Sequence, residues 1–234
     1  MLKFPFLPQI GRDDIIPYLD AYCRVRGLFP STSVGGETTM ILGHYAAAYV
    51  ARPHARSAPF WLLLICSNLA EFLWLGLALL GIESPEPSSL FDATFQNLQV
   101  HMTYSHNLIP NLNLGLLVYG LVLLRFRSQK LALWCAFLTV SHVWLDFIVG
   151  FEHQVLGPES MSIGLNSYAR FPHLAVIIEW LFSMACLVYY FRSESRAGMP
   201  VSRKKKSVLL IAFSVGVLLW LPNATIPMRD LLPF

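Results

Sequence analysis

The sequence predicts an all-α fold: a polytopic transmembrane helical bundle of about six helices. The 234-residue chain is 55% hydrophobic and only 13% charged, and its mean hydropathy is +0.53. This charged fraction is about half of the ~25% that is typical of soluble domains. The apolar residues gather into long runs, and basic residues follow alternate runs. Composition, run length and charge placement therefore all indicate an integral membrane protein.

Six apolar segments are expected to form the helices, and a spanning helix needs about 20 residues. In order, the segments are Thr38–Ala51, Pro59–Ile82, Leu108–Leu124, Leu131–Gly150, Pro172–Phe191 and Val208–Leu221. The second, fourth and fifth are long enough, and the third is marginal. The first and last are short, so they could be tilted, extended by their flanks or only partly inserted.

These segments define three parts of the chain. An N-terminal segment, residues 1–36, is expected to be irregular or interfacial because it combines prolines with charges of both signs. Residues 37–222 form the predicted transmembrane domain. Residues 223–234 form a short C-terminal tail.

The basic residues predict the orientation of the bundle. They follow the first, third and fifth segments, as Arg52 and Arg56, as Arg125, Arg127 and Lys130, and as Arg192, Arg196 and the run Arg203–Lys206. Loops rich in Lys and Arg stay on the cytoplasmic side. The other loops, and with six spans both termini, are then expected to face outward. The net charge of +3 is too small to indicate nucleic-acid binding.

Ionisable residues inside the apolar segments point to a function. His142 and Asp146 lie four residues apart in the fourth segment, so they share one helix face. A central Asp costs about 3 kcal/mol on insertion scales, and such groups mark functional sites by default. Histidine with aspartate is also a plausible ligand pair for a divalent metal ion. The alternative interpretation is a hydrogen bond within the helix.

Other polar residues lie at similar predicted depths. His44 and Glu71 lie in the first and second segments, His106 begins the third, and Glu179 lies in the fifth. Given the predicted topology, these groups can share a polar interior in the outer half of the bundle. Glu179 could instead pair with a neighbouring helix.

Four short motifs in order resemble a known family. They are Gly43-His44, Glu71-Phe72-Leu73-Trp74, Tyr104-Ser105-His106 and Ser141-His142-Val143-Trp144-Leu145-Asp146. The set is similar to that of small bacterial integral-membrane proteins known as membrane-bound metal-dependent hydrolases. The resemblance extends from Thr38 to Phe191 and includes the stretch Ile163–Ser167. It departs from the family at Ser67–Glu71, where aspartate is common.

The resemblance implies a metal centre in a bacterial inner membrane protein, and the topology predicted from the basic loops places this site on the outward side. It would carry metal-ligand roles onto His44, Glu71, His106, His142, Asp146 and, more distantly, His153.

The first hypothesis for function is a membrane-embedded metal hydrolase. His44, His106, His142 and Asp146 would hold zinc or another divalent ion, and Glu71 would complete a second metal position or act as general base. A bound metal ion lowers the pKa of water and so generates hydroxide at neutral pH. An outward site among apolar helices suits a lipid-like substrate, such as a phospholipid or a lipid-linked phosphate ester. Membrane lipid is the expected partner.

Several alternatives use the same polar cluster. Interior His, Asp and Glu side chains also serve proton or cation pathways. A non-catalytic membrane protein, or a subunit of a larger membrane complex, could use the cluster structurally. A haem or di-iron bundle is a further alternative, although the sequence has no Glu-x-x-His pair.

Overall fold

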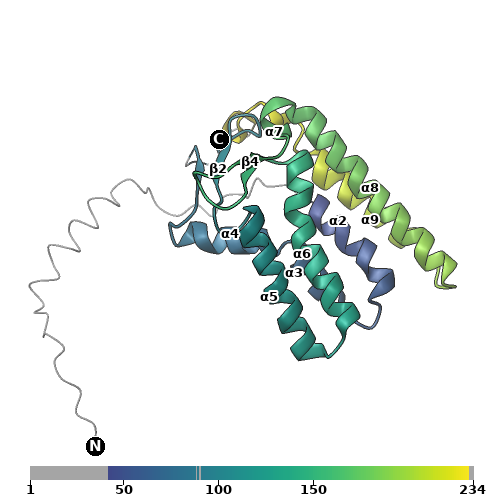
Figure 1. The fold of residues 1–234 in the computed structure, drawn as a ribbon. Helices are drawn as coiled ribbons and strands as arrows, with labels where there is room; N and C mark the ends of the chain where they lie inside the picture. The colour runs from purple at the N-terminus through teal and green to yellow at the C-terminus, as the bar shows by residue number, and fades with distance from the viewer. Residues whose placement is uncertain (1–41, 88, 90, 232–234) are drawn as a thin grey trace, which may run out of the picture. The chain divides into compact units, whose positions relative to one another are not determined.

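The computed structural model describes residues 42–231 except 88 and 90, and this part of the chain is mostly helical (Figure 1). The helices are α2 (Gly43–Ala51), α3 (Phe60–Ser67), α4 (Leu69–Leu79), α5 (Leu108–Phe126), α6 (Gln129–Val149), α7 (Ser167–Arg170), α8 (Pro172–Arg196), α9 (Arg203–Leu218) and α10 (Met228–Leu231), with 3-10 turns at Arg52–His54 and Pro222–Ala224. Two small antiparallel hairpins pair β1 (Ser84–Glu86) with β2 (Gln99–His101) and β3 (His153–Gln154) with β4 (Ser162–Ile163).

Several helices are long and apolar enough to cross a membrane, as the sequence predicts. Among the described residues there are four, Leu108–Phe126, Gln129–Val149, Pro172–Arg196 and Arg203–Ala224, or five if the bent pair α3 and α4 is one span. The last segment is longer than the sequence predicts, because its helix begins at Arg203, within the basic run, and not at Val208. The described part of the first segment is a helix of nine residues. The segment predicted for residues 1–36 lies outside the described residues.

The second apolar segment is not one straight helix. It forms α3 and α4, which are bent by 60° at Asn68. Serine and asparagine favour such a break because their side chains compete for backbone groups. Here the Ser67 hydroxyl and the Asn68 amide both donate to the carbonyl of Leu64. The break frees the carbonyls of Cys66 and Ser67, which then accept hydrogen bonds from α6 side chains.

The helices pack around α6 and α8. α6 packs against α5, α3 and α2, while α8 packs against α2 and α9. Gly115 lets α5 approach α6 closely, because a Cβ atom there would collide with the side chain of Val140. A buried apolar cluster built around Leu63, Ala132 and Leu138 fills the space between α2, α3, α5 and α6.

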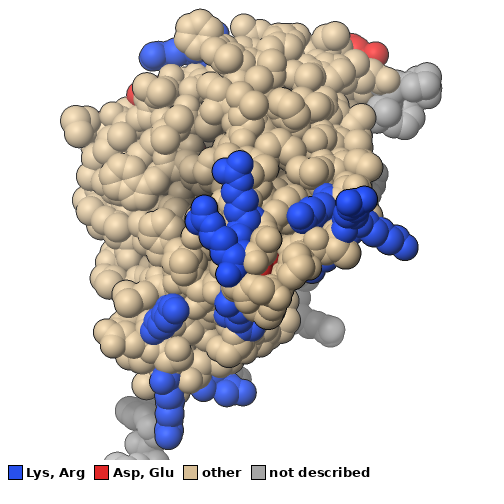
Figure 2. Space-filling model, turned by 90° about the vertical axis from the view of Figure 1, so that its right-hand side faces the viewer, with Lys and Arg blue, Asp and Glu red and all other residues tan. Residues whose placement is uncertain are grey.

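The two ends of this bundle differ. One end, at the bottom of Figure 1, carries the turn between α5 and α6, and the other carries the hairpins and α7. Figure 2 shows most Lys and Arg side chains on the visible face from mid-height downward, away from the hairpin end. This segregation follows the alternating loops of the sequence.

The predicted C-terminal tail packs on the hairpin end where it is described. The Asn223 amide donates to the carbonyl of Ala93, and the amide N–H of Arg229 donates to the carbonyl of Phe91. The Arg229 guanidinium also pairs with Asp92 at 2.7 Å. The tail therefore covers residues 91–96.

Candidate metal centre

Five of the residues singled out in the sequence come together near the hairpin end of the bundle. His44 comes from α2, Glu71 from α4, and His142 and Asp146 from α6, while His106 lies two residues before the start of α5. All three histidines are at most 1% exposed. The closest contacts between a histidine and a carboxylate join Nε2 of His142 to Oε1 of Glu71 at 3.3 Å, and Nε2 of His44 to Oδ1 of Asp146 at 3.2 Å. Four segments of the chain thus build one buried His, Asp and Glu cluster.

The bend at Asn68 orients His142. The Nδ1 atom of its ring lies 2.9 Å from the carbonyl oxygen of Ser67, at the end of α3. A carbonyl can only accept, so Nδ1 carries the proton and donates it. The Nε2 atom of His142 is then left with a lone pair, and this atom faces the cluster. Hydrogen bonding of one ring nitrogen to a backbone carbonyl is the usual way to fix a metal-binding histidine.

A chain of side chains orients His106 in the same way. The Ser105 hydroxyl donates to Oε2 of Glu83 at 2.7 Å, and Nδ1 of His106 lies 2.8 Å from that hydroxyl oxygen. Because the hydroxyl proton points to the carboxylate, Nδ1 of His106 is the donor. Oε1 of Glu83 is held by the amide groups of Tyr104 and Ser105. His106 therefore also turns a lone pair on Nε2 toward the cluster.

The two lone pairs face each other. The Nε2 atoms of His106 and His142 are 3.2 Å apart, and Oε1 of Glu71 lies within 3.5 Å of each. When both rings are neutral and protonated on Nδ1, neither Nε2 atom carries a proton to share with the other. A cation at this position would satisfy both nitrogens and the carboxylate together, so the donor set fits a metal ion.

The ring nitrogens of His44 also lack hydrogen-bond partners among the described residues. Although its Nε2 atom is 3.2 Å from Asp146, the contact lacks hydrogen-bond geometry. The ring stacks on that of His142, with centroids 3.5 Å apart. Buried polar atoms without partners are costly and uncommon, and a bound ion would remove this cost.

Two overlapping triads have the spacing of metal ligands. One is His44, Glu71 and His142, and the other is His106, His142 and Asp146. Both depend on Nε2 of His142, because its Nδ1 is bonded to the backbone. One nitrogen lone pair binds one ion, so the two triads cannot each bind their own ion through His142.

Glu179 lies beside the cluster and holds α2 in place. Its Oε1 atom accepts from the amide groups of Leu42 and Gly43 at 3.0 and 2.9 Å, and its Oε2 accepts from the Tyr168 hydroxyl at 2.9 Å. A carboxylate at a helix N-terminus satisfies free N–H groups and complements the helix dipole. Glu179 thus pairs with a neighbouring helix and positions His44, which lies in the first turn of that helix.

His153 lies next to the cluster but belongs to neither triad. Its ring is parallel to that of His106, with centroids 5.5 Å apart, and its Nε2 has no hydrogen-bond partner among the described residues. Burial lowers the pKa of His153 to about 4. The imidazole is therefore neutral at physiological pH and retains a lone pair.

Some supporting groups cannot be found from the sequence. Glu83 follows the second apolar segment and has the pattern of an ordinary loop carboxylate, yet only 2% of it is exposed. The Ser67 carbonyl has no side-chain signature at all. The one available signal was the Ser105-His106 pair, because a serine beside a ligating histidine can orient its ring.

Comparisons with models of protein families, with curated proteins and with solved structures find no significant match. The geometry of the cluster is therefore the basis for assigning it a function.

Proposed function

We propose that this chain is an integral membrane protein that holds one divalent metal ion, zinc as first candidate, and hydrolyses an ester or phosphoester of an amphiphilic lipid. The observation that carries this proposal is the distance of 3.2 Å between the Nε2 atoms of His106 and His142. Both atoms face the cluster, where Oε1 of Glu71 lies within 3.5 Å of each. Zinc favours such sets of imidazole nitrogen and carboxylate oxygen.

The residues divide into two roles. His106, His142 and Asp146 are assigned to the ion, and His44 contacts Asp146 from the other side. Glu71 is assigned as general base, because it lines a small cavity together with His106 and Asp146. This cavity of about 10 Å³ has room for roughly one water molecule. A bound zinc ion would lower the pKa of that water, and the Glu71 carboxylate is placed to accept its proton.

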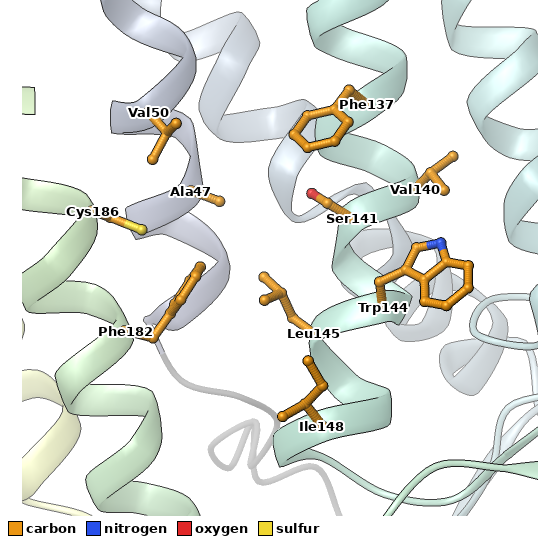
Figure 3. Close-up of a pocket in the computed structure, with 10 residues that line it drawn as sticks. All are labelled: Ala47, Val50, Phe137, Val140, Ser141, Trp144, Leu145, Ile148, Phe182 and Cys186. Atoms are coloured by element: carbon orange, nitrogen blue, oxygen red, sulfur yellow. The ribbon is translucent and has the colours of Figure 1, made fainter. Parts of the chain in front are cut away.

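An apolar groove supports a lipid substrate. The groove, of about 430 Å³, lies between α2, α6 and α8 (Figure 3). Its lining side chains are apolar except for the Trp144 indole nitrogen and the Ser141 hydroxyl, which already donates to the carbonyl of Leu138. A hydrocarbon chain is therefore the occupant that this lining favours. Adjacent residues of α6 belong to the groove and to the cluster. Leu145 lines the groove, and Asp146 lies in the cluster beside His142.

A cation or proton pathway is less well supported. Such a path needs polar groups on both sides of the cluster. Between the cluster and the basic turns, most of the described buried residues belong to the apolar cluster around Leu63, Ala132 and Leu138. The buried Thr139 hydroxyl in this region already bonds the carbonyls of Cys66 and Cys135. The polar groups therefore open toward the hairpin end alone, which suits an enzyme better than a conduit.

The proposal includes a location. The resemblance to membrane-bound metal-dependent hydrolases and the membrane-length helices favour a bacterial inner membrane. Because basic loops are retained in the cytoplasm, the hairpin end with its cluster would face outward.

The test is purification in detergent followed by elemental analysis and an assay on phospholipid vesicles. We expect about one zinc ion per chain, and hydrolysis that stops on chelation and returns with zinc. His142→Ala should lose the ion and the activity. His54→Ala is the matched control, because His54 lies in the basic turn and bonds Tyr189 instead. A protein without bound metal, or a His142→Ala variant that retains it, would refute the metal centre.

A further inference from the structure

A second pocket lies beside the cluster at the hairpin end, and its lining is polar. It has a volume of about 220 Å³. Its polar lining residues are His101, Thr103, Asn107, Glu152, His153, Gln154 and Ser162. They come from the two hairpins, from the residues that flank them and from the residue before α5. The apolar groove and this pocket therefore suit different occupants.

The walls of the pocket are tied together by hydrogen bonds. The Asn107 amide oxygen accepts from the backbone N–H of Gln154 at 3.0 Å, and its amide nitrogen donates to the carbonyl of Leu156 at 3.3 Å. The backbone N–H of Ile109 also donates to the carbonyl of Val155 at 2.9 Å. The β3–β4 hairpin is thereby fixed to the start of α5, and the pocket is preformed.

His153 connects the pocket to the cluster. His153 and Met102 line both this pocket and the small cavity that Glu71, His106 and Asp146 border. The side chain of His153 is buried, with 4% of the residue exposed, and its Nε2 has no hydrogen-bond partner among the described residues. A buried, unpartnered imidazole nitrogen thus lies between the two spaces.

The charge of the pocket favours a cation. Its lining has the Glu152 carboxylate and two imidazoles, and none of the lining residues is Lys or Arg. Glu152 is exposed at the rim. Oxygen and imidazole nitrogen are donors that divalent ions such as zinc accept.

We propose that this pocket is the route by which a divalent metal ion reaches the cluster, with Glu152 attracting the ion and His153 binding it transiently. The route rests on the proposed metal centre but adds residues outside it. The ion exchanges water ligands for Nε2 of His153 and then exchanges that nitrogen for the nitrogens of the cluster. No bond within the protein breaks, and His153 returns to its starting state.

The test measures the rate at which zinc enters and leaves the purified full-length protein. Metal-free protein in detergent is mixed with zinc, and uptake is followed with a zinc-sensitive dye, while release is followed after adding a chelator. His153→Ala should slow uptake and release by the same factor, about tenfold, and leave the final zinc content unchanged. Glu152→Gln should slow uptake about threefold, with the difference disappearing at high salt because exposed charges are screened.

Glu159→Gln is the control. Glu159 is an exposed carboxylate in the connection between β3 and β4, and it does not line the pocket. Unchanged rates in His153→Ala and Glu152→Gln would overturn the route while leaving the metal centre intact. Loss of bound zinc in His153→Ala would also overturn it, by making His153 a permanent ligand. If His153→Ala does not fold, the salt-dependent effect of Glu152→Gln decides. A wild-type protein that takes up no zinc refutes the metal centre itself.

Discussion

At the scale of single residues, the arrangement of the cluster depends on the Nδ1 atoms of His106 and His142, which point away from it. The Nδ1–H group of His142 donates to the Ser67 carbonyl, and that of His106 donates to the Ser105 hydroxyl. These bonds decide the tautomer and so decide that Nε2 is available to an ion. Groups outside the cluster therefore decide which nitrogen atom each histidine could offer to an ion.

Glu83 gives the sharpest test of this control. In Glu83→Gln one end of the side chain becomes a donor, so Ser105 loses its fixed acceptor and Nδ1 of His106 is no longer the only possible donor. Loss of such an outer partner typically costs 10–100-fold in metal affinity, and we expect about tenfold weaker zinc binding in a competitive titration. Glu159→Gln, an exposed carboxylate, should bind as the wild type does. Equal affinities in both variants would contradict the assigned tautomer.

At the scale of elements, the break between α3 and α4 builds much of the site. An unbroken helix would use the carbonyls of Cys66 and Ser67 internally, and Thr139 and His142 would lose their partners. Non-helical backbone at membrane depth is tolerated where it is buried in protein or lines a cavity. The 60° bend therefore supplies two backbone acceptors to α6 next to the cluster.

Asn68→Leu tests the break. The substitution removes the side chain that competes for the Leu64 carbonyl and replaces it with a strong helix former. We expect a straighter α3–α4 segment, displacement of Glu71 and the Ser67 carbonyl, and about tenfold lower zinc affinity. Asn113→Leu makes the same change at an exposed position on α5 and serves as control. Wild-type affinity in Asn68→Leu would show that the bend is imposed by packing instead.

The Glu179 cap on α2 makes a separate prediction at this scale. Glu179→Gln keeps an acceptor for the amides of Leu42 and Gly43 but loses its charge. Loss of a charged cap costs about 1 kcal/mol, which lowers Tm by about 3 °C in a chain of this size. Zinc affinity should fall as well, because α2 positions His44. Tyr168→Phe, which removes a single bond to Oε2, should have the smaller effect on affinity. The reverse order would contradict the positioning role.

At the scale of the whole molecule, some features could be predicted from sequence and others could not. The apolar runs predicted several membrane-length helices because hydropathy acts over many residues. The i, i+4 spacing predicted that His142 and Asp146 share a face, and they do, at 3.5 Å. The bend at Asn68 was not predicted, because Ser67 and Asn68 are short interruptions of an otherwise apolar run and the break also depends on partners in α6. Glu83 was missed for the same reason, since its partner lies 22 residues away.

Orientation is the property of the whole molecule on which the function depends most. If basic loops are cytoplasmic, then the hairpin end, the polar pocket and the cluster are all reached from outside. Single cysteines introduced at two exposed positions test this. Arg127→Cys lies in the basic turn between α5 and α6, and Glu159→Cys lies in the hairpin connection.

Each cysteine is introduced into a chain in which Cys23 is replaced by Ser; the other native thiols, Cys66, Cys135 and Cys186, are buried. A membrane-impermeant thiol reagent should label Glu159→Cys in intact cells stripped of any outer barrier, and should label Arg127→Cys only after the membrane is permeabilised. Labelling of both in permeabilised cells is the internal control. The opposite pattern would place the cluster on the cytoplasmic side. The metal ion and the polar end of the substrate would then have to come from inside the cell, because the apolar core around Leu63 closes the other end of the bundle.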